Sequence, residues 1–293
     1  MIKVFSNVSN DLGEGPLWHP ARQTLLWLDI NKCLLFEKHI NSTAKSYDSC
    51  WDIPEIGSAL ALSEHNSIIY LITDKSLVSF DLTSGVFKRE LTLNIPGDMR
   101  ANDGGVSPNG TFWFGTMEKQ PSGKNGAIYS ISSKGLITQQ FNGIGIPNTM
   151  TWSNDGNQLF VSDSWLQVMY SFKVINNTLI PSSQTEVLNL TATQATPDGG
   201  ATDVNDNIWN AHWDGFKIAC LSPNGQVLQE IAVPVPKPTS CCFGGADNNS
   251  LFITSAREGM NEKELNDYPS SGAVFVLRLS VFGSVTPSFL MDF

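Results

Sequence analysis

The sequence predicts an all-β protein, a six-bladed β-propeller whose blades are four-stranded antiparallel sheets around a central channel. Two observations predict this fold: a phrase repeated six times at the spacing of propeller blades, and the strand and turn composition of each copy. The two best copies, Asn102–Trp113 and Asp198–Trp209, align without a gap. The other copies begin near Glu14, Ser58, Asn148 and Ser240.

The repeat has the length of a propeller blade. Successive copies are 42 to 50 residues apart, which is the range of four-stranded blades. Some helical repeats have similar lengths, so the residue types within each copy must decide between them. One position of the phrase keeps an oxygen-bearing side chain, and across the six copies it reads Glu14, Ser58, Asn102, Asn148, Asp198 and Ser240.

Each copy has a short apolar run, a polar turn and a second short apolar run. The turns Ser107–Gly110 and Ser153–Asn157 contain Asn-Gly and Asp-Gly, which are hairpin signals between such runs. The second runs, for example Ile68–Ile72, are rich in β-branched and aromatic residues. No long stretch has helical periodicity, and 24 Gly and 15 Pro are typical of many turns. The longest irregular segment is expected at residues 256–271.

The six copies occupy the chain from end to end, so residues 1–293 are predicted to form a single domain. In a propeller the first strand of each blade lines the central channel. Equivalent positions of the repeat should therefore form a ring near one end of the channel. For this reason Glu14, Asn102, Asn148 and Asp198 are treated as one constellation.

Composition excludes several classes of partner. The net charge of −10 disfavours nucleic acids and anionic membrane surfaces. No apolar run approaches the ~20 residues that span a bilayer, and Met1–Asn7 is too short and polar for a signal peptide. Five cysteines without a CxxC pair indicate reduced thiols. We therefore expect a cytoplasmic protein with no nucleic acid, membrane or obligatory protein partner.

Three residues of the ring form a candidate metal site. Glu14, Asn148 and Asp198 supply two carboxylates and an amide carbonyl, which are hard oxygen donors that suit Ca²⁺, Mg²⁺ or Mn²⁺, with Zn²⁺ as a further option. Two carboxylates at one channel mouth would repel each other, and a divalent cation removes that repulsion. The alternative is that these polar residues only cap the turns at the blade starts.

Other residues are candidates for substrate contact. Arg100 lies two residues before Asn102, so both side chains share one face of a strand and could hold substrate hydroxyls or a developing oxyanion; a lone Arg is otherwise a surface residue. Glu118 follows Gly115–Met117 and lies near the predicted rim. His212 is the one histidine of interest. Serine-nucleophile, dinucleotide and P-loop motifs are absent, which disfavours those chemistries.

Together the phrases resemble the SMP-30/gluconolactonase/LRE-like family, which includes regucalcin and sugar lactonases. The resembling segments run from near the start of the chain to residue 245, and they are Gly13–Trp18, Arg100–Gly105, Trp113–Met117, Ile146–Trp152, Asp198–Gly200 and Pro238–Gly245. The resemblance implies a six-bladed propeller with one divalent metal in its channel. It also implies metal ligation by Glu14, Asn148 and Asp198, substrate contact by Arg100 and Asn102, and, more loosely, substrate contact by Glu118.

The function expected from the residues and the resemblance is gluconolactonase-like hydrolysis of sugar (aldono) lactones to aldonic acids. The metal would act as a Lewis acid on the lactone carbonyl, and Asp198 would be the general base for the attacking water. Ca²⁺ is the expected metal, with Zn²⁺, Mn²⁺ and Mg²⁺ as alternatives. Two rival functions stay open: hydrolysis of another ester or phosphoester on the same metal platform, and a non-enzymatic calcium-binding or regulatory role. The sequence does not identify the lactone.

Overall fold

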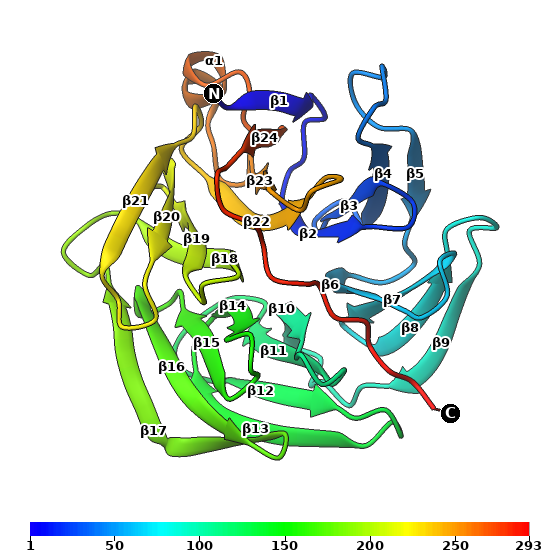
Figure 1. The fold of residues 1–293 in the computed structure, drawn as a ribbon, viewed down its shortest axis with the longest axis vertical. Coiled ribbons are helices and arrows are strands. Elements are labelled where there is room, and N and C mark those ends of the chain that lie inside the picture. The colour runs from blue at the N-terminus through cyan, green and yellow to red at the C-terminus, as the bar shows by residue number, and fades with distance from the viewer. Residues whose placement is uncertain (293) are drawn as a thin grey trace.

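The computed structural model describes residues 1–292, and these form six four-stranded antiparallel sheets arranged as blades in a ring (Figure 1). The predicted six-bladed β-propeller is therefore confirmed. Within each sheet the strands follow one another from the central channel to the rim, and neighbouring strands pair antiparallel.

The strands fall into four sets by their place in the blade. The innermost strands are β2 (Gly13–His19), β6 (Gly57–Leu62), β10 (Met99–Val106), β14 (Pro147–Trp152), β18 (Thr196–Thr202) and β22 (Pro238–Gly244). The second strands are β3 (Thr24–Asp29), β7 (Ile68–Thr73), β11 (Phe112–Glu118), β15 (Gln158–Asp163), β19 (Ile208–Trp213) and β23 (Ser250–Ser255). The third strands are β4 (Leu34–His39), β8 (Ser76–Asp81), β12 (Gly126–Ile131), β16 (Val168–Ile175), β20 (Lys217–Leu221) and β24 (Val274–Arg278). The outermost strands are β5 (Ser49–Asp52), β9 (Phe87–Thr92), β13 (Ile137–Ile144), β17 (Thr178–Asn189), β21 (Val227–Ala232) and β1 (Lys3–Ser6).

Strand β1 closes the ring. It comes from the start of the chain, yet it pairs antiparallel with β24 and completes the sixth blade, with Lys3 opposite Val276. The repeated phrases correspond to the first two strands of each blade, so they say nothing about the fourth strand of the last one. The sequence repeat therefore predicted the number of blades but did not identify the strand that closes them.

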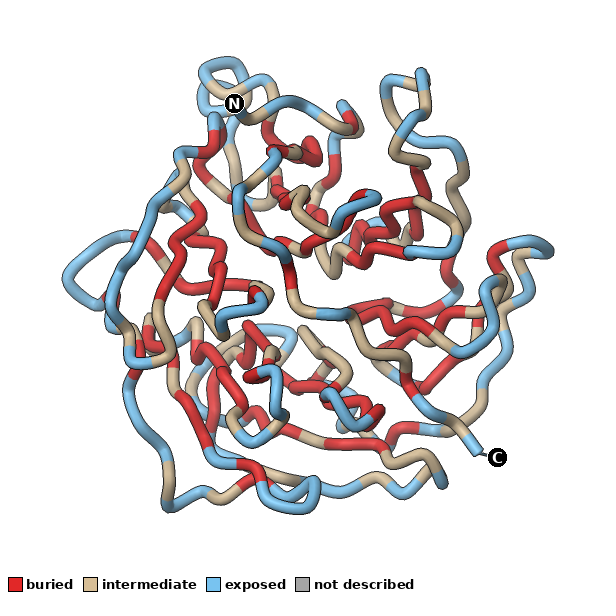
Figure 2. The backbone as a smooth tube through the Cα atoms, in the orientation of Figure 1, coloured by how far each residue is buried: buried red, intermediate tan, exposed pale blue. Residues whose placement is uncertain are grey.

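The hydrophobic core lies between blades rather than at one centre. Six clusters of buried side chains occur, and each joins two neighbouring blades, including the sixth and the first. Trp27, Trp113 and Trp209 are among the largest fully buried side chains, and each belongs to one of these clusters. Buried segments accordingly follow the inner strands, while the outermost strands are mostly exposed (Figure 2).

The expected irregular segment at 256–271 contains one short helix, α1 (Glu262–Asp267). A capping box begins the helix, because Asn261 accepts from the backbone of Glu264 and the Glu264 carboxylate accepts from the backbone of Asn261. In the part of the chain that the structure describes, no helix is long and apolar enough to cross a membrane, since α1 has only six residues.

The last residues of the chain cross the channel as a strap, defined here as residues 282–292 (Figure 1). One end is bonded to the fifth blade, where Ser284 N donates to Thr202 O at 3.1 Å. The other end is bonded to the second blade, where Phe289 N donates to Leu62 O at 2.8 Å. The Phe289 side chain is 1 % exposed and packs against Tyr70 and Phe112, with ring centroids 5.1 and 5.7 Å away.

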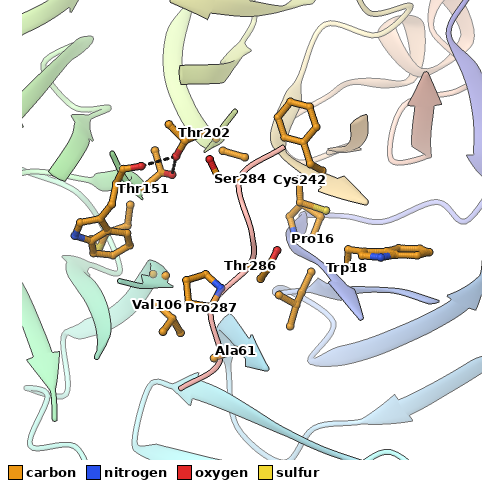
Figure 3. A pocket seen from close by; sticks show the side chains of 18 of the residues that line it. Pro16, Trp18, Ala61, Val106, Thr151, Thr202, Cys242, Ser284, Thr286 and Pro287 are labelled. Atoms are coloured by element: carbon orange, nitrogen blue, oxygen red, sulfur yellow. Dashed lines mark hydrogen bonds between the residues drawn. The ribbon is translucent and has the colours of Figure 1, made fainter. Parts of the chain in front are cut away.

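A cavity of about 430 Å³ lies in the channel beneath the strap. Its walls come from the inner strands, and Ser284, Thr286 and Pro287 of the strap lie across it (Figure 3). Apart from Ser240 and the strap, the residues that line it come after the repeated oxygen-bearing position in their blades, and Asp103 is the only charged residue in the lining that the structure describes. The strap therefore covers the end of the channel opposite the candidate metal ligands.

We predict that Phe289→Ala lowers the free energy of unfolding by about 3–5 kcal/mol, because the change leaves a cavity between the second and third blades. Equilibrium unfolding in urea measures this. Val285→Ala is the matched control, since Val285 is on the same strap but 85 % exposed, and it should change stability by less than about 0.5 kcal/mol. Equal effects of the two substitutions would contradict the anchoring role of Phe289.

Candidate metal and substrate site

The pairing of every innermost strand with its neighbour is irregular at the repeated position. Register shifts occur between Glu14 and Leu17, Gly57 and Ala59, Ala101 and Gly104, Asn148 and Thr151, Pro197 and Gly200, and Pro238 and Ser240. An extra residue at such a bulge re-aims the neighbouring side chains. A register shift thus occurs at the oxygen-bearing position in all six blades.

Thr149 has an unusual backbone at its bulge. Its φ is +54°, a left-handed conformation that is rare for a β-branched residue. The hydroxyl holds this conformation in place, because it pairs with the Ser162 hydroxyl at 2.8 Å, accepts from Asn210 Nδ2 at 2.8 Å and donates to the Asp198 carbonyl. Thr149 therefore ties the strand of Asn148 to the strand of Asp198.

A chain of hydrogen bonds joins candidate residues from neighbouring blades. Arg100 Nη1 donates to Asn102 Oδ1 at 2.8 Å, and Asn102 Nδ2 donates to Asn148 Oδ1 at 2.7 Å. Asn148 Nδ2 then donates to Ser164 Oγ at 2.8 Å, and Ser164 Oγ donates to Pro197 O at 2.6 Å. Three of the predicted residues, Arg100, Asn102 and Asn148, are thus in one network that ends beside Asp198.

Glu14 and Asp198 form the acidic part of the site. Burial raises the pKa of Asp198 well above its usual value, and the charges of Glu14 and Asp103 raise it further. Burial also raises the pKa of Glu14, to about 8, with the charge of Asp103 as the next cause. Within residues 1–292 neither Glu14 nor Asp198 forms an ion pair within 4 Å. Two carboxylates therefore lie near each other without a cationic side chain bonded to either.

The structure adds two acidic residues that sequence reasoning did not place in the site. Asp103 accepts from Gly104 N at 2.7 Å, and burial raises its pKa to about 6. The position of Asp103 directly after Asn102 is the feature of the sequence that could have placed it in the site. Glu258 lies in the irregular segment 256–271, and its charge raises the pKa of both Glu14 and Asp198. No repeat or motif pointed to it.

Glu118 is not part of this network. It ends β11, and its carboxylate accepts from Ser122 N at 2.8 Å and from Asn125 Nδ2 at 3.0 Å within its own loop. These bonds lower the pKa of Glu118. A role in substrate contact remains a prediction for this residue.

The donor set fits a divalent cation. Glu14 and Asp198 supply carboxylate oxygens whose raised pKa values show that two negative charges are costly there in the absence of a cation. The Asn148 carbonyl oxygen accepts one hydrogen bond from Asn102, and an amide oxygen has a second lone pair for a metal. Among residues 1–292 no three His, Cys, Asp or Glu side chains are grouped to hold a metal, and the predicted set of ligands contains two carboxylates and the amide of Asn148.

His212 packs beside the site without taking part in it. It is opposite Pro197 across the β18–β19 pair and is 2 % exposed. Neither ring nitrogen has a hydrogen-bond partner within residues 1–292, and burial lowers the pKa of His212 to about 4, helped by the charge of Lys217. The ring is therefore neutral in the folded protein and serves packing.

A six-bladed β-propeller with an acidic, oxygen-rich site at one end of its channel is the class of protein that these observations define. The chain belongs to the SMP-30/Gluconolactonase/LRE-like region family, because the model of that family matches residues 12–257 of this chain. It is 31% identical over 280 residues to 6-deoxy-6-sulfogluconolactonase of Pseudomonas putida, and this alignment covers 95% of this chain and 94% of that protein. It is 26% identical over 289 residues to L-arabinolactonase of Azospirillum brasilense, and this alignment covers 98% of this chain and 94% of that protein. The crystal structure of regucalcin from Agrobacterium tumefaciens, described as a calcium-binding protein, superposes with a TM-score of 0.92 at 30% identity, covering 98% of this chain and 96% of that one.

We predict that Thr149→Val lowers the free energy of unfolding by about 1–3 kcal/mol, because a buried hydroxyl with three partners is lost, and weakens divalent-cation binding measured by calorimetry. Thr151→Val is the matched control. Thr151 is on the same strand and its hydroxyl pairs with Thr202, away from the candidate ligands. Equal cation affinity in the two variants would show that Thr149 does not hold Asn148 and Asp198 in register.

The lowered pKa of the buried His212 predicts that the protein loses stability in acid. The pKa of His212 is about 4 in the fold, whereas an ordinary histidine, as in the unfolded chain, has a pKa of about 6.5, so the unfolded chain binds a proton more readily between these values. The stabilising contribution is therefore complete above pH 6.5 and is lost as pH falls toward 4, by about 3 kcal/mol.

The measurement is urea unfolding of the wild type and His212→Gln from pH 7 to pH 4. The difference between the two proteins isolates His212 from the carboxylates, whose raised pKa values act in the opposite direction. The wild type should lose its advantage over the variant as the pH falls. A difference that stays constant with pH would rule out the neutral buried histidine.

Proposed function

We propose that this chain hydrolyses sugar (aldono) lactones to aldonic acids and uses a divalent cation held by Glu14, Asn148 and Asp198. The observation that carries the proposal is the convergence of these donors from three blades beside the Arg100–Asn102 pair. Two of its relatives are named for lactones, one an arabinolactone and the other a sulfogluconolactone. A relative described as calcium-binding supports Ca²⁺ as the first cation to test; Zn²⁺, Mn²⁺ and Mg²⁺ suit the same oxygen donors.

The chain's own residues divide the work of the reaction. Asp198 is the general base that takes the proton from the attacking water, since it is a buried carboxylate at the channel mouth. Arg100 and Asn102 bind the hydroxyl groups of the substrate and stabilise negative charge on the carbonyl oxygen. Asn102 also fixes the amide of Asn148. When bound, the cation supplies Lewis-acid polarisation of the lactone carbonyl.

The first experiment is the hydrolysis of a panel of aldonolactones by metal-stripped protein, to which Ca²⁺, Mg²⁺, Mn²⁺ and Zn²⁺ are returned one at a time. Proton release near neutral pH follows the reaction. Acceleration above the spontaneous rate with a cation supports the proposal and ranks metal and sugar together. Activity only on aryl esters or phosphotriesters would favour the other hydrolase function, and tight Ca²⁺ binding without any turnover would favour a regulatory one.

Two substitutions separate the roles within the site. Asp198→Ala should abolish turnover and weaken cation binding, because it removes both a ligand and the base. Asn102→Ala should lower kcat by about 10–100-fold while calorimetry still detects the bound cation. Activity near that of the wild type in Asp198→Ala would reject Asp198 as the base, and loss of the cation in Asn102→Ala would make Asn102 a ligand.

A further inference from the structure

Glu258 is held rigidly where the sixth blade meets the first. Its backbone nitrogen donates to Asp11 O at 2.9 Å, and its carbonyl accepts from Lys237 Nζ at 2.8 Å. Its carboxylate accepts from Asn31 Nδ2 at 3.0 Å. Because Leu12 also bridges to Ala256, this segment lies directly beside the start of β2, two residues from Glu14. Glu258 is thus a fixed part of the wall at this end of the channel.

The carboxylate of Glu258 keeps its charge unpaired. Among the residues that the structure describes it forms no ion pair within 4 Å, and its partner Asn31 is neutral. The nearby ammonium of Lys237 bonds to the main-chain oxygen and lies 4.6 Å from the ring centroid of Trp213. The negative charge of Glu258 is therefore available to act on whatever enters the site.

This charge reaches the candidate substrate residues. Burial lowers the pKa of Arg100, and Glu258 opposes that effect more strongly than Glu14 or Asp198 does. Arg100 forms no ion pair within 4 Å in the described part of the chain, and its guanidinium donates to Ala101 O and Asn102 Oδ1. Glu258 thus adds a negative charge at the end of the channel where its segment lies beside the start of β2, and this charge acts on Arg100 of the third blade.

Lactone hydrolysis changes the charge of the molecule in the site. Water adds to the carbonyl carbon, the ring C–O bond breaks, and the ring oxygen leaves as a hydroxyl group. The resulting carboxylic acid loses its proton near neutral pH, since such groups have pKa values near 3–4. A neutral substrate thereby becomes an anionic product. A fixed negative charge disfavours the product and any substrate that is already anionic, while it leaves an uncharged lactone unaffected.

We propose that Glu258 is a specificity-determining residue that makes the site select uncharged lactones over anionic ones and promotes release of the aldonate product. The proposal rests on the lactonase function proposed above and narrows its substrate class.

The test compares Glu258→Gln with the wild type. Glutamine keeps the size of the side chain and can still accept from Asn31, so the wall should be preserved while the charge is removed. Glu262→Gln is the matched control, because it removes the same charge four residues away on the exposed first turn of α1. Glu258→Asp, which restores a carboxylate, is the conservative variant.

Two measurements are made on each cation-loaded variant. The first is the ratio of kcat/KM for a lactone that carries one free carboxylate, such as a glucarolactone, to that for an uncharged aldonolactone. The second is the dissociation constant of the aldonate product, measured by calorimetry. In Glu258→Gln the ratio should rise about 5–10-fold and the aldonate should bind more tightly by a similar factor, with smaller effects at high salt. Glu262→Gln and Glu258→Asp should resemble the wild type.

The outcomes separate this inference from the lactonase proposal. A wild type that hydrolyses the uncharged lactone, together with the same ratio and aldonate affinity in Glu258→Gln and Glu262→Gln, overturns the role of Glu258 and leaves the function intact. A wild type that hydrolyses no lactone overturns the function and, with it, the substrate selection proposed here. If Glu258→Gln does not fold, Glu258→Ala removes the same carboxylate together with its bond to Asn31; reduced discrimination in that variant supports the inference, and unchanged discrimination overturns it.

Discussion

Each blade of this propeller has two apolar faces, and that constraint determines the rest of the structure. A single four-stranded sheet cannot bury both faces, so every blade needs a neighbour on each side. The six clusters of buried side chains show how this is met, because each cluster is shared by two adjacent blades. Burial is complete only when the sixth blade reaches the first. Pairing of β1 with β24 joins the two ends of the chain within one sheet and closes the ring.

Closure also creates the site. Once the blades surround a channel, the same position of six repeats is brought to one end of it, and the bulges at this position alter the direction of the side chains. Hydrogen bonds between blades then fix the set, as when the Thr149 hydroxyl bonds to the Asp198 carbonyl. The left-handed backbone of Thr149 is tolerated because its surroundings determine it on several sides. Local strain thus accompanies the part of the fold where chemistry is proposed.

The repeat predicted the number of blades, the strands that line the channel and the residues that meet there. Arg100, Asn102 and Asn148 are joined by hydrogen bonds, as their register suggested. Other features depended on information that the repeat does not carry. β1 is separated from β24 by almost the whole chain, and the strap follows the last repeat. Glu258 lies in a segment with no counterpart in the other blades, so only the three-dimensional structure could bring it near Arg100.

The balance of charge in the site explains why these additions matter. Glu14, Asp103, Asp198 and Glu258 supply four carboxylates, and Arg100 is the cationic side chain among them. A divalent cation bound by Glu14 and Asp198 offsets those two charges, and Arg100 offsets one more. One of the four negative charges is then left over, and Glu258 at the wall is a carboxylate that is not a proposed ligand of the cation. A site with this residual charge accepts a neutral ring more readily than the anion that hydrolysis produces. The residues proposed to hold the cation and the residue proposed to repel the product therefore form one electrostatic unit, assembled only when the ring of blades is closed.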